Sequence, residues 1–188
     1  MSRENREILC LNRWKFPDRF RKRPFYEMRH FKTYLKDEAG TAALGAALAR
    51  ALEPGISIYL HGDLGAGKTA LTRALLHAAG HPGHVKSPTY TLAEPYSVMI
   101  AGRAVEAIHF DLYRMASPEE FLDAGFREYF NHQTICIVEW PEKAGPVLPA
   151  PDINIFLTIS GEGRDVELQG LSDQGSQCLD RLHFMPNL

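Results

Sequence analysis

The glycine-rich stretch HGDLGAGKT at residues 61–69 constrains the fold of this chain more than any other part of the sequence. Its pattern, a glycine followed by four residues and then Gly-Lys-Thr, is that of a phosphate-binding loop, which joins the end of a strand to the start of a helix. Both neighbours are present. The apolar run ISIYL at 56–60 indicates a strand, and leucines on one side of residues 68–79 indicate a helix that Gly80 ends. The chain is therefore expected to bind a nucleotide.

The residues of this loop have separable expected roles. Glycines let backbone N–H groups turn toward phosphate without a Cβ in the way, and the N-terminus of the following helix adds partial positive charge. Lys68 supplies a charge to the β- and γ-phosphates, and Thr69 offers its hydroxyl to Mg²⁺. The predicted cofactors are ATP and Mg²⁺, and the predicted nucleotide-binding residues are Gly62, Asp63, Leu64, Gly65, Ala66, Gly67, Lys68 and Thr69.

Two carboxylates follow apolar runs that indicate buried strands: Asp111 after AIHF and Glu139 after ICIV. Both strands are expected to deliver their acid at the carboxyl edge of a parallel sheet, beside the phosphate-binding loop. Mg²⁺ prefers carboxylate and water as ligands. One acid is predicted to hold Mg²⁺ and the other to position the attacking water, with the assignment left open. The alternatives are structural: Asp111 pairs with nearby Arg114, and Glu139 pairs with a cation.

The segment KSPTYT lies between the loop and the strand that ends at Asp111. In many P-loop nucleotidases this interval responds to the γ-phosphate, and Ser87, Thr89 and Thr91 offer hydroxyl groups for that task. The alternative is a Ser-Pro turn followed by an edge strand. Thr89 is the residue of this segment that we predict to belong to the catalytic site.

The histidines do not indicate a metal centre. His81 and His84, in HPGH, are expected on a loop surface. His109 lies two residues before Asp111 and shares its strand face. It is interpreted as a strand histidine rather than a ligand.

Hydrophobic periodicity predicts the remaining elements. Strands are expected at 31–35, 90–96, 105–111, 134–140, 153–160 and 164–171, the last two joined by the turn GEGR. A helix with a buried leucine stripe should follow the N-cap Asp37, and a short helix should follow Ser117, with Glu120 completing a capping box. The predicted fold class is α/β: a P-loop NTPase-like mixed, mainly parallel sheet flanked by helices, with a C-terminal antiparallel hairpin.

The length of 188 residues predicts one domain, placed at 29–170 and followed by a C-terminal tail at 171–188. Residues 1–28 form a basic leader that mixes cations with aromatic side chains, a composition able to bind nucleic acid. Because the sequence from Met28 reads as an ordinary domain start, the leader is expected to be disordered or a start-site artefact.

Composition narrows the class of protein. The net charge of −2 gives no overall field for nucleic acid, no apolar run approaches the roughly 20 residues of a membrane span, and no apolar segment of a signal peptide follows the N-terminus. The three cysteines are far apart, which is typical of a reducing compartment. A cytoplasmic protein without membrane contact is expected.

Motifs of other nucleotide-binding classes are missing from the sequence. There is no [NT]-K-x-D, which disfavours a guanine-specific GTPase, no LSGGQ signature, and no clear acceptor site or lid of a small-molecule kinase. The pattern favours a minimal ATPase that acts on another protein.

Several motifs, in this order and spacing, resemble the TsaE (YjeE-like) family: GDLGAGKT, VKSPTYTL, HFDLYR, EEFLDAGFREYF and IVEWPEKA. The resemblance covers roughly residues 30–160. It implies a P-loop ATPase of bacterial tRNA threonylcarbamoyladenosine biosynthesis, with a mixed sheet between helices. It also implies that Thr89 belongs to a switch-like loop, that Asp111 and Glu139 are the two functional acids, and that Trp140 is the family's characteristic tryptophan.

The same resemblance implies two partners, TsaD-like and TsaB-like proteins, and contact with tRNA only through their complex. The ATPase would support repeated turnover of the modification without carrying out the transfer itself. Two other functions stay open on the sequence: a small-molecule kinase of P-loop type, and a nucleotide-sensing adaptor that does not hydrolyse.

Overall fold

The computed structural model describes residues 29–183. The predicted leader at 1–28 lies outside this range. Within it, no helix has both the length and the apolar character needed to cross a membrane.

Seven strands form one sheet in the order β1-β7-β6-β2-β5-β4-β3. The four central strands run parallel to one another: β6 (Ile153–Ser160), β2 (Ser57–His61), β5 (Thr134–Glu139) and β4 (Arg103–Asp111). The outer strands pair antiparallel: β1 (His30–Leu35) with β7 (Gly163–Gly170), β7 with β6, and β3 (Ala93–Ile100) with β4. The predicted mixed sheet, with its C-terminal hairpin, is confirmed.

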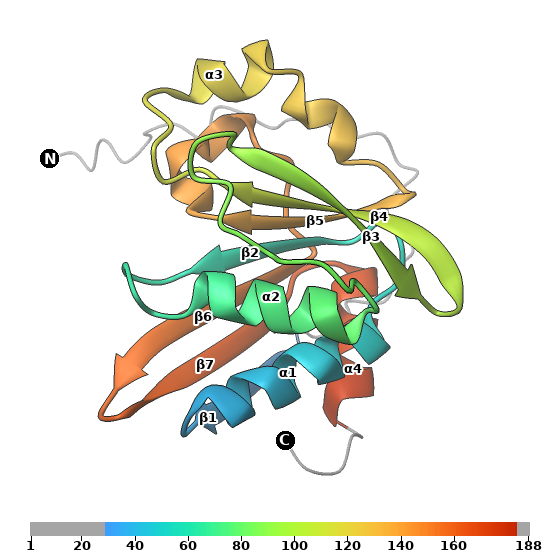
Figure 1. The fold of residues 1–188 in the computed structure, drawn as a ribbon, viewed down its shortest axis with the longest axis vertical. Helices are drawn as coiled ribbons and strands as arrows, with labels where there is room; N and C mark the ends of the chain where they lie inside the picture. The colour runs from blue at the N-terminus through green and yellow to red at the C-terminus, as the bar shows by residue number, and fades with distance from the viewer. Residues whose placement is uncertain (1–28, 184–188) are drawn as a thin grey trace, which may run out of the picture.

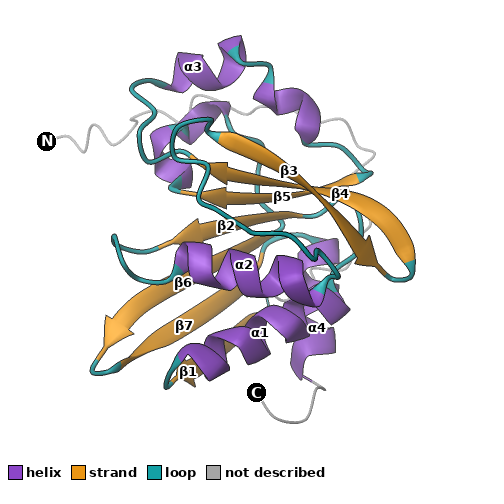
Figure 2. Ribbon diagram, in the orientation of Figure 1, coloured by secondary structure: helices purple, strands orange, loops and turns teal. Residues whose placement is uncertain are grey.

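Three helices cover one face of the sheet (Figure 1): α1 (Glu38–Ala51), α2 (Lys68–Ala78) and α4 (Asp173–His183). Figure 2 shows α1 and α2 lying side by side across the central strands. The other face carries α3 (Pro118–Asp123) and three 3₁₀ turns, η2 (Phe126–Tyr129), η3 (Pro141–Lys143) and η4 (Gly145–Val147). β2 and β5, at the centre of the sheet, are consequently buried on both faces, which explains their near-continuous apolar sequences.

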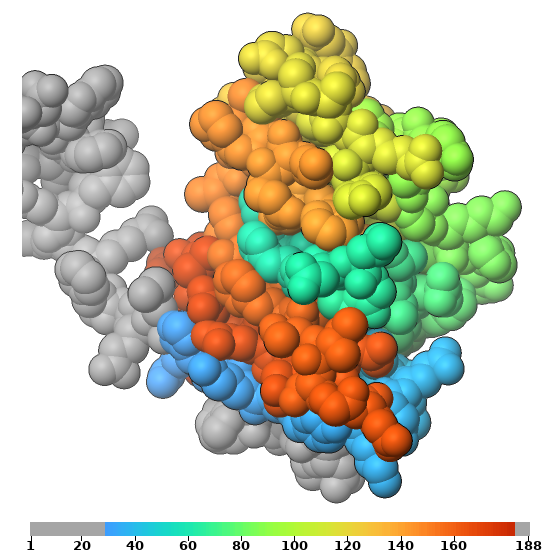
Figure 3. All heavy atoms as spheres, turned by 90° about the vertical axis from the view of Figure 1, so that its left-hand side faces the viewer, coloured from blue at the N-terminus to red at the C-terminus, as the bar shows by residue number. Residues whose placement is uncertain are grey.

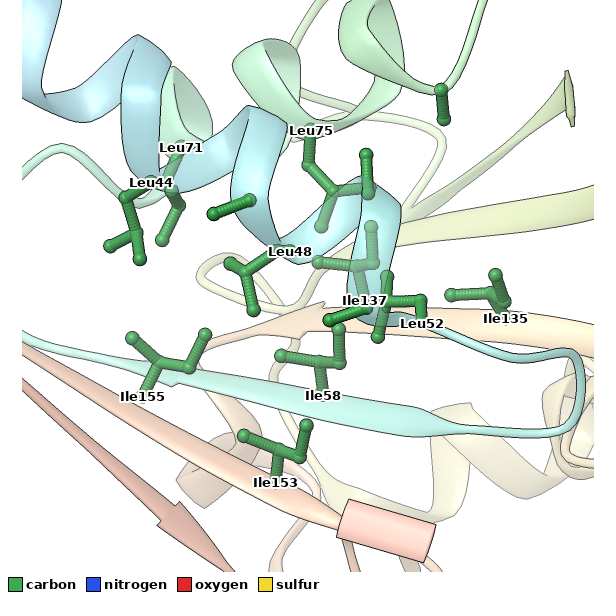
Figure 4. Packing of buried hydrophobic residues seen from close by; sticks show 14 of the residues in the cluster. Leu44, Leu48, Leu52, Ile58, Leu71, Leu75, Ile135, Ile137, Ile153 and Ile155 are labelled. Atoms are coloured by element: carbon green, nitrogen blue, oxygen red, sulfur yellow. The ribbon is translucent and has the colours of Figure 1, made fainter. Parts of the chain in front are cut away.

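Two hydrophobic clusters lie on opposite sides of the sheet. The larger one joins the leucine stripe of α1 to α2 and to the inward side chains of the central strands (Figure 4); its labelled members are Leu44, Leu48, Leu52, Ile58, Leu71, Leu75, Ile135, Ile137, Ile153 and Ile155. The helix that carries this stripe begins at the predicted N-cap: the Asp37 side chain accepts a hydrogen bond from Gly40 N at 3.0 Å. The smaller cluster is aromatic and centres on Phe110 and Phe121.

One strand prediction was displaced. The segment predicted as a strand at 90–96 enters the sheet only at Ala93, because residues 88–92 form a turn closed by Leu92 N on Pro88 O at 2.6 Å. Leu92 has a φ of +62° there. The strand then continues to Ile100, since the turn at Ala101 and Gly102 lets the chain pair back along β4.

The capping box predicted at Ser117 is wrong in detail. The helix does begin at Pro118, but the Ser117 side chain makes no cap hydrogen bond. The Glu120 carboxylate accepts from Ala116 N at 3.2 Å, one residue before the expected partner.

The segment predicted as a C-terminal tail contains a helix. In α4 the side chains of Ser176, Cys178, Leu179 and Leu182 are buried, at helical spacing, against β7 and α1. Ser172 caps the helix by accepting from Gly175 N at 3.0 Å. Its few apolar residues, Cys178, Leu179 and Leu182, recur at helical spacing, a signal that sequence reasoning did not use.

Candidate active site

The phosphate-binding loop joins β2 to α2, as its motif requires. Gly62 has a φ of +139° and Gly67, the residue before the helix, a φ of +105°. A Cβ on Gly62 would collide with the carbonyl oxygen of Leu157 on the neighbouring strand. Only glycine fits at this close approach, so the motif glycine is required by packing as well as by backbone conformation.

Lys68 is buried at the mouth of this loop, with 4% of its surface exposed. Its ammonium donates hydrogen bonds to Gly62 O at 2.5 Å and Asp63 O at 2.9 Å, and it lies 3.8 Å from the centre of the Trp140 ring. Burial lowers the pKa of Lys68, while the carboxylates of Glu139, Glu142 and Asp111 act in the opposite direction. The cation is thus held beside carbonyl oxygens that an anion is able to replace.

Glu139 and Asp111 are neighbours across β5 and β4, where they face each other in register at the carboxyl ends of the strands. Both are almost fully buried. Glu139 Oε2 accepts a hydrogen bond from Thr69 Oγ1 at 3.0 Å, and its Oε1 is 2.8 Å from His109 Nε2. The P-loop threonine and the strand acid are therefore already in contact.

Asp111 is held by a different set of groups. Its Oδ2 accepts hydrogen bonds from Ser87 and, at 2.8 Å, from Thr89 Oγ1, and its Oδ1 accepts from Tyr113 N at 3.2 Å. In the part of the chain that the structure describes, Arg114 makes no ion pair with Asp111; its guanidinium lies 4.5 Å from the centre of the Tyr90 ring. The structural role considered for Asp111, as a partner of Arg114, is not what this geometry shows.

These groups surround one open pocket with a volume of about 500 Å³. It lies at the carboxyl edge of the parallel strands, on the side of the molecule that faces the viewer in Figure 3, where the P-loop segment is drawn in teal. Its lining combines P-loop residues, two hydroxyl residues of the 87–89 segment, both acids and three residues beyond the strand ends: Leu64, Gly65, Gly67, Lys68, Thr69, Ala70, Ser87, Thr89, Asp111, Tyr113, Arg114, Glu139 and Trp140.

Some predicted residues lie outside this lining. Gly62 and Asp63 reach the site only through the carbonyl oxygens that bind Lys68, and Ala66 is buried beneath the loop. Thr91 borders a separate hollow, with His84 and Tyr96, on the outer side of the 87–92 turn. Among residues 29–183, no group of three or more His, Cys, Asp or Glu side chains has the arrangement of a metal centre.

Sequence reasoning missed three contributors. Tyr113 and Arg114 line the pocket from the segment after β4, and His109 contacts Glu139 rather than serving only as a strand residue. Trp140, noted only by resemblance, has a φ of +59°, so the chain turns sharply after β5 and folds the indole ring back over Lys68. A left-handed residue of this kind has no local sequence signal in a tryptophan.

Comparison with known proteins gives consistent matches. The family model for "Threonylcarbamoyl adenosine biosynthesis protein TsaE" matches residues 35–166. The chain is 43% identical over 157 residues to the tRNA threonylcarbamoyladenosine biosynthesis protein TsaE of Haemophilus influenzae, covering 81% of this chain and 97% of that one. It is 33% identical over 162 residues to the Bacillus subtilis protein of the same name, covering 86% and 99%.

A solved structure shares the fold. The crystal structure of Bacillus subtilis YdiB superposes with a TM-score of 0.70, covering 84% of this chain and 97% of that one, at 24% sequence identity. This likeness concerns the arrangement of helices and strands.

Proposed function

Because the chain belongs to the TsaE family, whose members act in tRNA threonylcarbamoyladenosine biosynthesis, we propose that it is a Mg²⁺-dependent ATPase supporting turnover of the modification complex. The observation that carries the proposal is the convergence of Lys68, Thr69, Asp111 and Glu139 on one pocket at the carboxyl edge of the sheet. In P-loop proteins these residue types bind, neutralise and hydrolyse a nucleoside triphosphate.

The residues present fit a triphosphate. The loop between β2 and α2 offers backbone N–H groups and a helix N-terminus, and the buried Lys68 ammonium donates to two carbonyl oxygens and is covered by the Trp140 ring. Phosphate oxygens are stronger acceptors than carbonyls, so exchange of these hydrogen bonds for phosphate favours binding. The absence of a guanine-recognition motif from the sequence supports ATP over GTP.

The Thr69 hydroxyl and the Glu139 carboxylate fit Mg²⁺. They are hard oxygen ligands in direct contact, and two protein oxygens are enough because Mg²⁺ keeps waters and takes phosphate oxygens as its other ligands. A Mg²⁺ ion held by these two groups would supply positive charge to the β- and γ-phosphates. We therefore assign Glu139 to the magnesium side of the site.

Asp111 then has the role of positioning the attacking water. It lies one strand farther from the P-loop than Glu139 and is bonded to Ser87 and Thr89. Its carboxylate is suited to accept a hydrogen bond from the attacking water and to orient it toward the γ-phosphate. Thr89 shares that carboxylate oxygen, so the state of the loop affects how the water is held.

The partners we propose are TsaD-like and TsaB-like proteins, with tRNA reached through their complex in the cytoplasm. The pocket is open, and 73% of Leu64 in its lining is exposed; Tyr90, which is 83% exposed, lies against Arg114 of the same lining. Hydrolysis in an open site is slow because bulk water weakens the electrostatic interactions between the protein and the reacting phosphate. A partner that orders the rim or adds a charge accelerates other P-loop enzymes by ~10³–10⁵, so weak basal hydrolysis and strong stimulation are expected.

The test is depletion of the protein from its host, followed by mass spectrometry of nucleosides from digested tRNA. Threonylcarbamoyladenosine should fall, and wild-type protein but not the Lys68→Ala variant should restore it. An unchanged level after complete depletion, with no second gene copy, would overturn the proposal. A phosphorylated small molecule formed without free phosphate would indicate the kinase instead, and binding without turnover in the presence of both partners would indicate the adaptor.

A further inference from the structure

We infer that His109 is a positioning residue for Glu139: its Nε2–H holds one carboxylate oxygen so that the other is presented to Thr69 and to bound Mg²⁺. The inference rests on the proposed role of Glu139. His109 is a buried histidine that the proposed chemistry does not otherwise use. His109 has no exposed surface, and its Nε2 lies 2.8 Å from Glu139 Oε1.

The sheet register places the pair. On β4, His109 is opposite Ile137 of β5, two residues before Glu139 and on the same face. The imidazole therefore reaches diagonally across the strand pair and approaches the carboxylate from within the core beneath α2. This approach is fixed by two central strands rather than by a loop, so the donor has little freedom to move.

The two oxygens of Glu139 have different partners. Oε1 faces His109, and Oε2 accepts from Thr69 Oγ1 at 3.0 Å. A carboxylate held at one oxygen still rotates about its terminal torsion, which is broad for glutamate. With both oxygens held, the plane of the group is set, and the oxygen directed at the pocket is the one beside the P-loop threonine.

The two nitrogens of the His109 ring have different surroundings. Nδ1 is buried and, among residues 29–183, has no hydrogen-bond partner. Since Glu139 Oε1 is an acceptor, Nε2 carries the proton. The geometry therefore corresponds to an Nε2–H that donates to Glu139 Oε1.

The first experiment compares three variants in nucleotide binding. His109→Leu removes the donor, His109→Gln keeps an N–H at a similar distance from the backbone, and Ile108→Ala is a control that opens a cavity on the opposite face of the same strand. The readout is the ratio of ATP affinity in Mg²⁺ to ATP affinity in EDTA. Loss of a group that orients a metal ligand typically costs ~10–100-fold.

We expect the ratio to fall by about that factor in His109→Leu, to recover largely in His109→Gln, and to stay unchanged in Ile108→Ala, with thermal melting confirming that all three are folded. In the double variant His109→Leu/Glu139→Ala, the ratio should equal that of Glu139→Ala alone. A wild-type ratio in folded His109→Leu, or additive losses in the double variant, would overturn the inference.

The second experiment needs neither metal nor nucleotide. The ¹⁵N resonances of the His109 ring in the full-length protein, assigned by their loss in His109→Gln, should show a proton on Nε2. The opposite tautomer would sink the positioning role even if ATP hydrolysis is confirmed. Conversely, the expected tautomer with no hydrolysis by the wild type, even with partners, would leave the His109–Glu139 contact established and the proposed ATPase function refuted.

Discussion

The two acids of the site are equally buried neighbours, yet they are held by different parts of the molecule. Glu139 is bonded to Thr69 at the start of α2 and to His109, two residues before the end of β4. Asp111 is bonded to Ser87 and Thr89, which belong to the turn-rich segment before β3. One carboxylate is anchored in the core, and the other is anchored in a loop.

This difference suggests that one acid serves the binding of magnesium and phosphate, and that the other serves the response of hydrolysis to nucleotide and partner. A group held by a helix and a central strand keeps its place as long as the domain is folded, whereas a group held by an exposed turn changes when that turn moves. We therefore expect changes on the Glu139 side to affect magnesium and phosphate binding directly. Changes on the Asp111 side should affect how hydrolysis responds to nucleotide and partner.

The largest expected effect comes from removing Lys68, the cation that interacts electrostatically with both acids. Lys68→Ala deletes the only side-chain charge that the P-loop supplies to the phosphates, so ATP binding should become too weak to be productive. Electrostatic groups of this type contribute roughly 2.7–4 kcal/mol, a factor of ~10²–10³. Isothermal titration with ATP and Mg²⁺ measures the loss. Near-normal affinity in a folded variant would contradict the assignment of this pocket as the nucleotide site.

Glu139→Gln is the next largest change, and it tests the anchored side of the comparison. The amide keeps the shape of the carboxylate but removes the charge proposed to face Mg²⁺. Single-turnover hydrolysis should fall by ~10²–10³, and the enhancement of ATP affinity by Mg²⁺ should shrink. ATP affinity in EDTA serves as the internal control. Unaltered magnesium dependence would remove Glu139 from the metal side and reverse the two roles.

Asp111→Asn should cost about 10² in the hydrolysis rate, near the lower limit for loss of a general base, because the amide still accepts a hydrogen bond but binds the proton of water poorly. In contrast to Glu139→Gln, the variant should keep its magnesium-dependent ATP affinity. Both quantities come from the same single-turnover and titration experiments. If magnesium dependence is lost here and retained in Glu139→Gln, the comparison between the two acids is inverted.

Much of this arrangement was accessible from the sequence because its signals are local. The P-loop motif requires a strand and a helix around it, and apolar runs that end in an acid predict strands that deliver the acid at one edge of the sheet. These arguments led to the pocket containing Lys68, Thr69, Asp111 and Glu139. The leucine stripe and the Asp37 cap of α1 were confirmed for the same reason.

The contacts that distinguish the two acids were not accessible. His109 reaches Glu139 only because two strands are paired in one register, and periodicity fixes the face of a strand but not its partner. The left-handed conformations of Leu92 and Trp140 depend on surrounding structure rather than on residue preference. The helical pattern of α4 rests on only three apolar residues, Cys178, Leu179 and Leu182, and sequence reasoning did not use it.

The smallest effect on intrinsic chemistry is expected from Thr89→Ala, and it is the sharpest test of the loop-anchored side. Ser87 and the Tyr113 N–H still bond Asp111 in this variant, so the acid keeps donors to both oxygens. ATP affinity and basal hydrolysis should consequently stay within about threefold of wild type, a change of less than ~0.7 kcal/mol in either quantity.

Stimulation by a TsaD–TsaB-like complex should behave differently. If the 87–92 segment changes conformation when the γ-phosphate is bound, the Thr89 hydroxyl connects that change to Asp111, and its removal breaks the connection. Thr89→Ala should then bind the partners and complete one round of tRNA modification but fail to support repeated rounds. Thr91→Ser, which changes a hydroxyl residue outside the pocket, is the matched control. Full multiple-turnover activity in Thr89→Ala would show that the loop holding Asp111 does not transmit the response to nucleotide and partners. The two acids would then differ only in their distance from the P-loop.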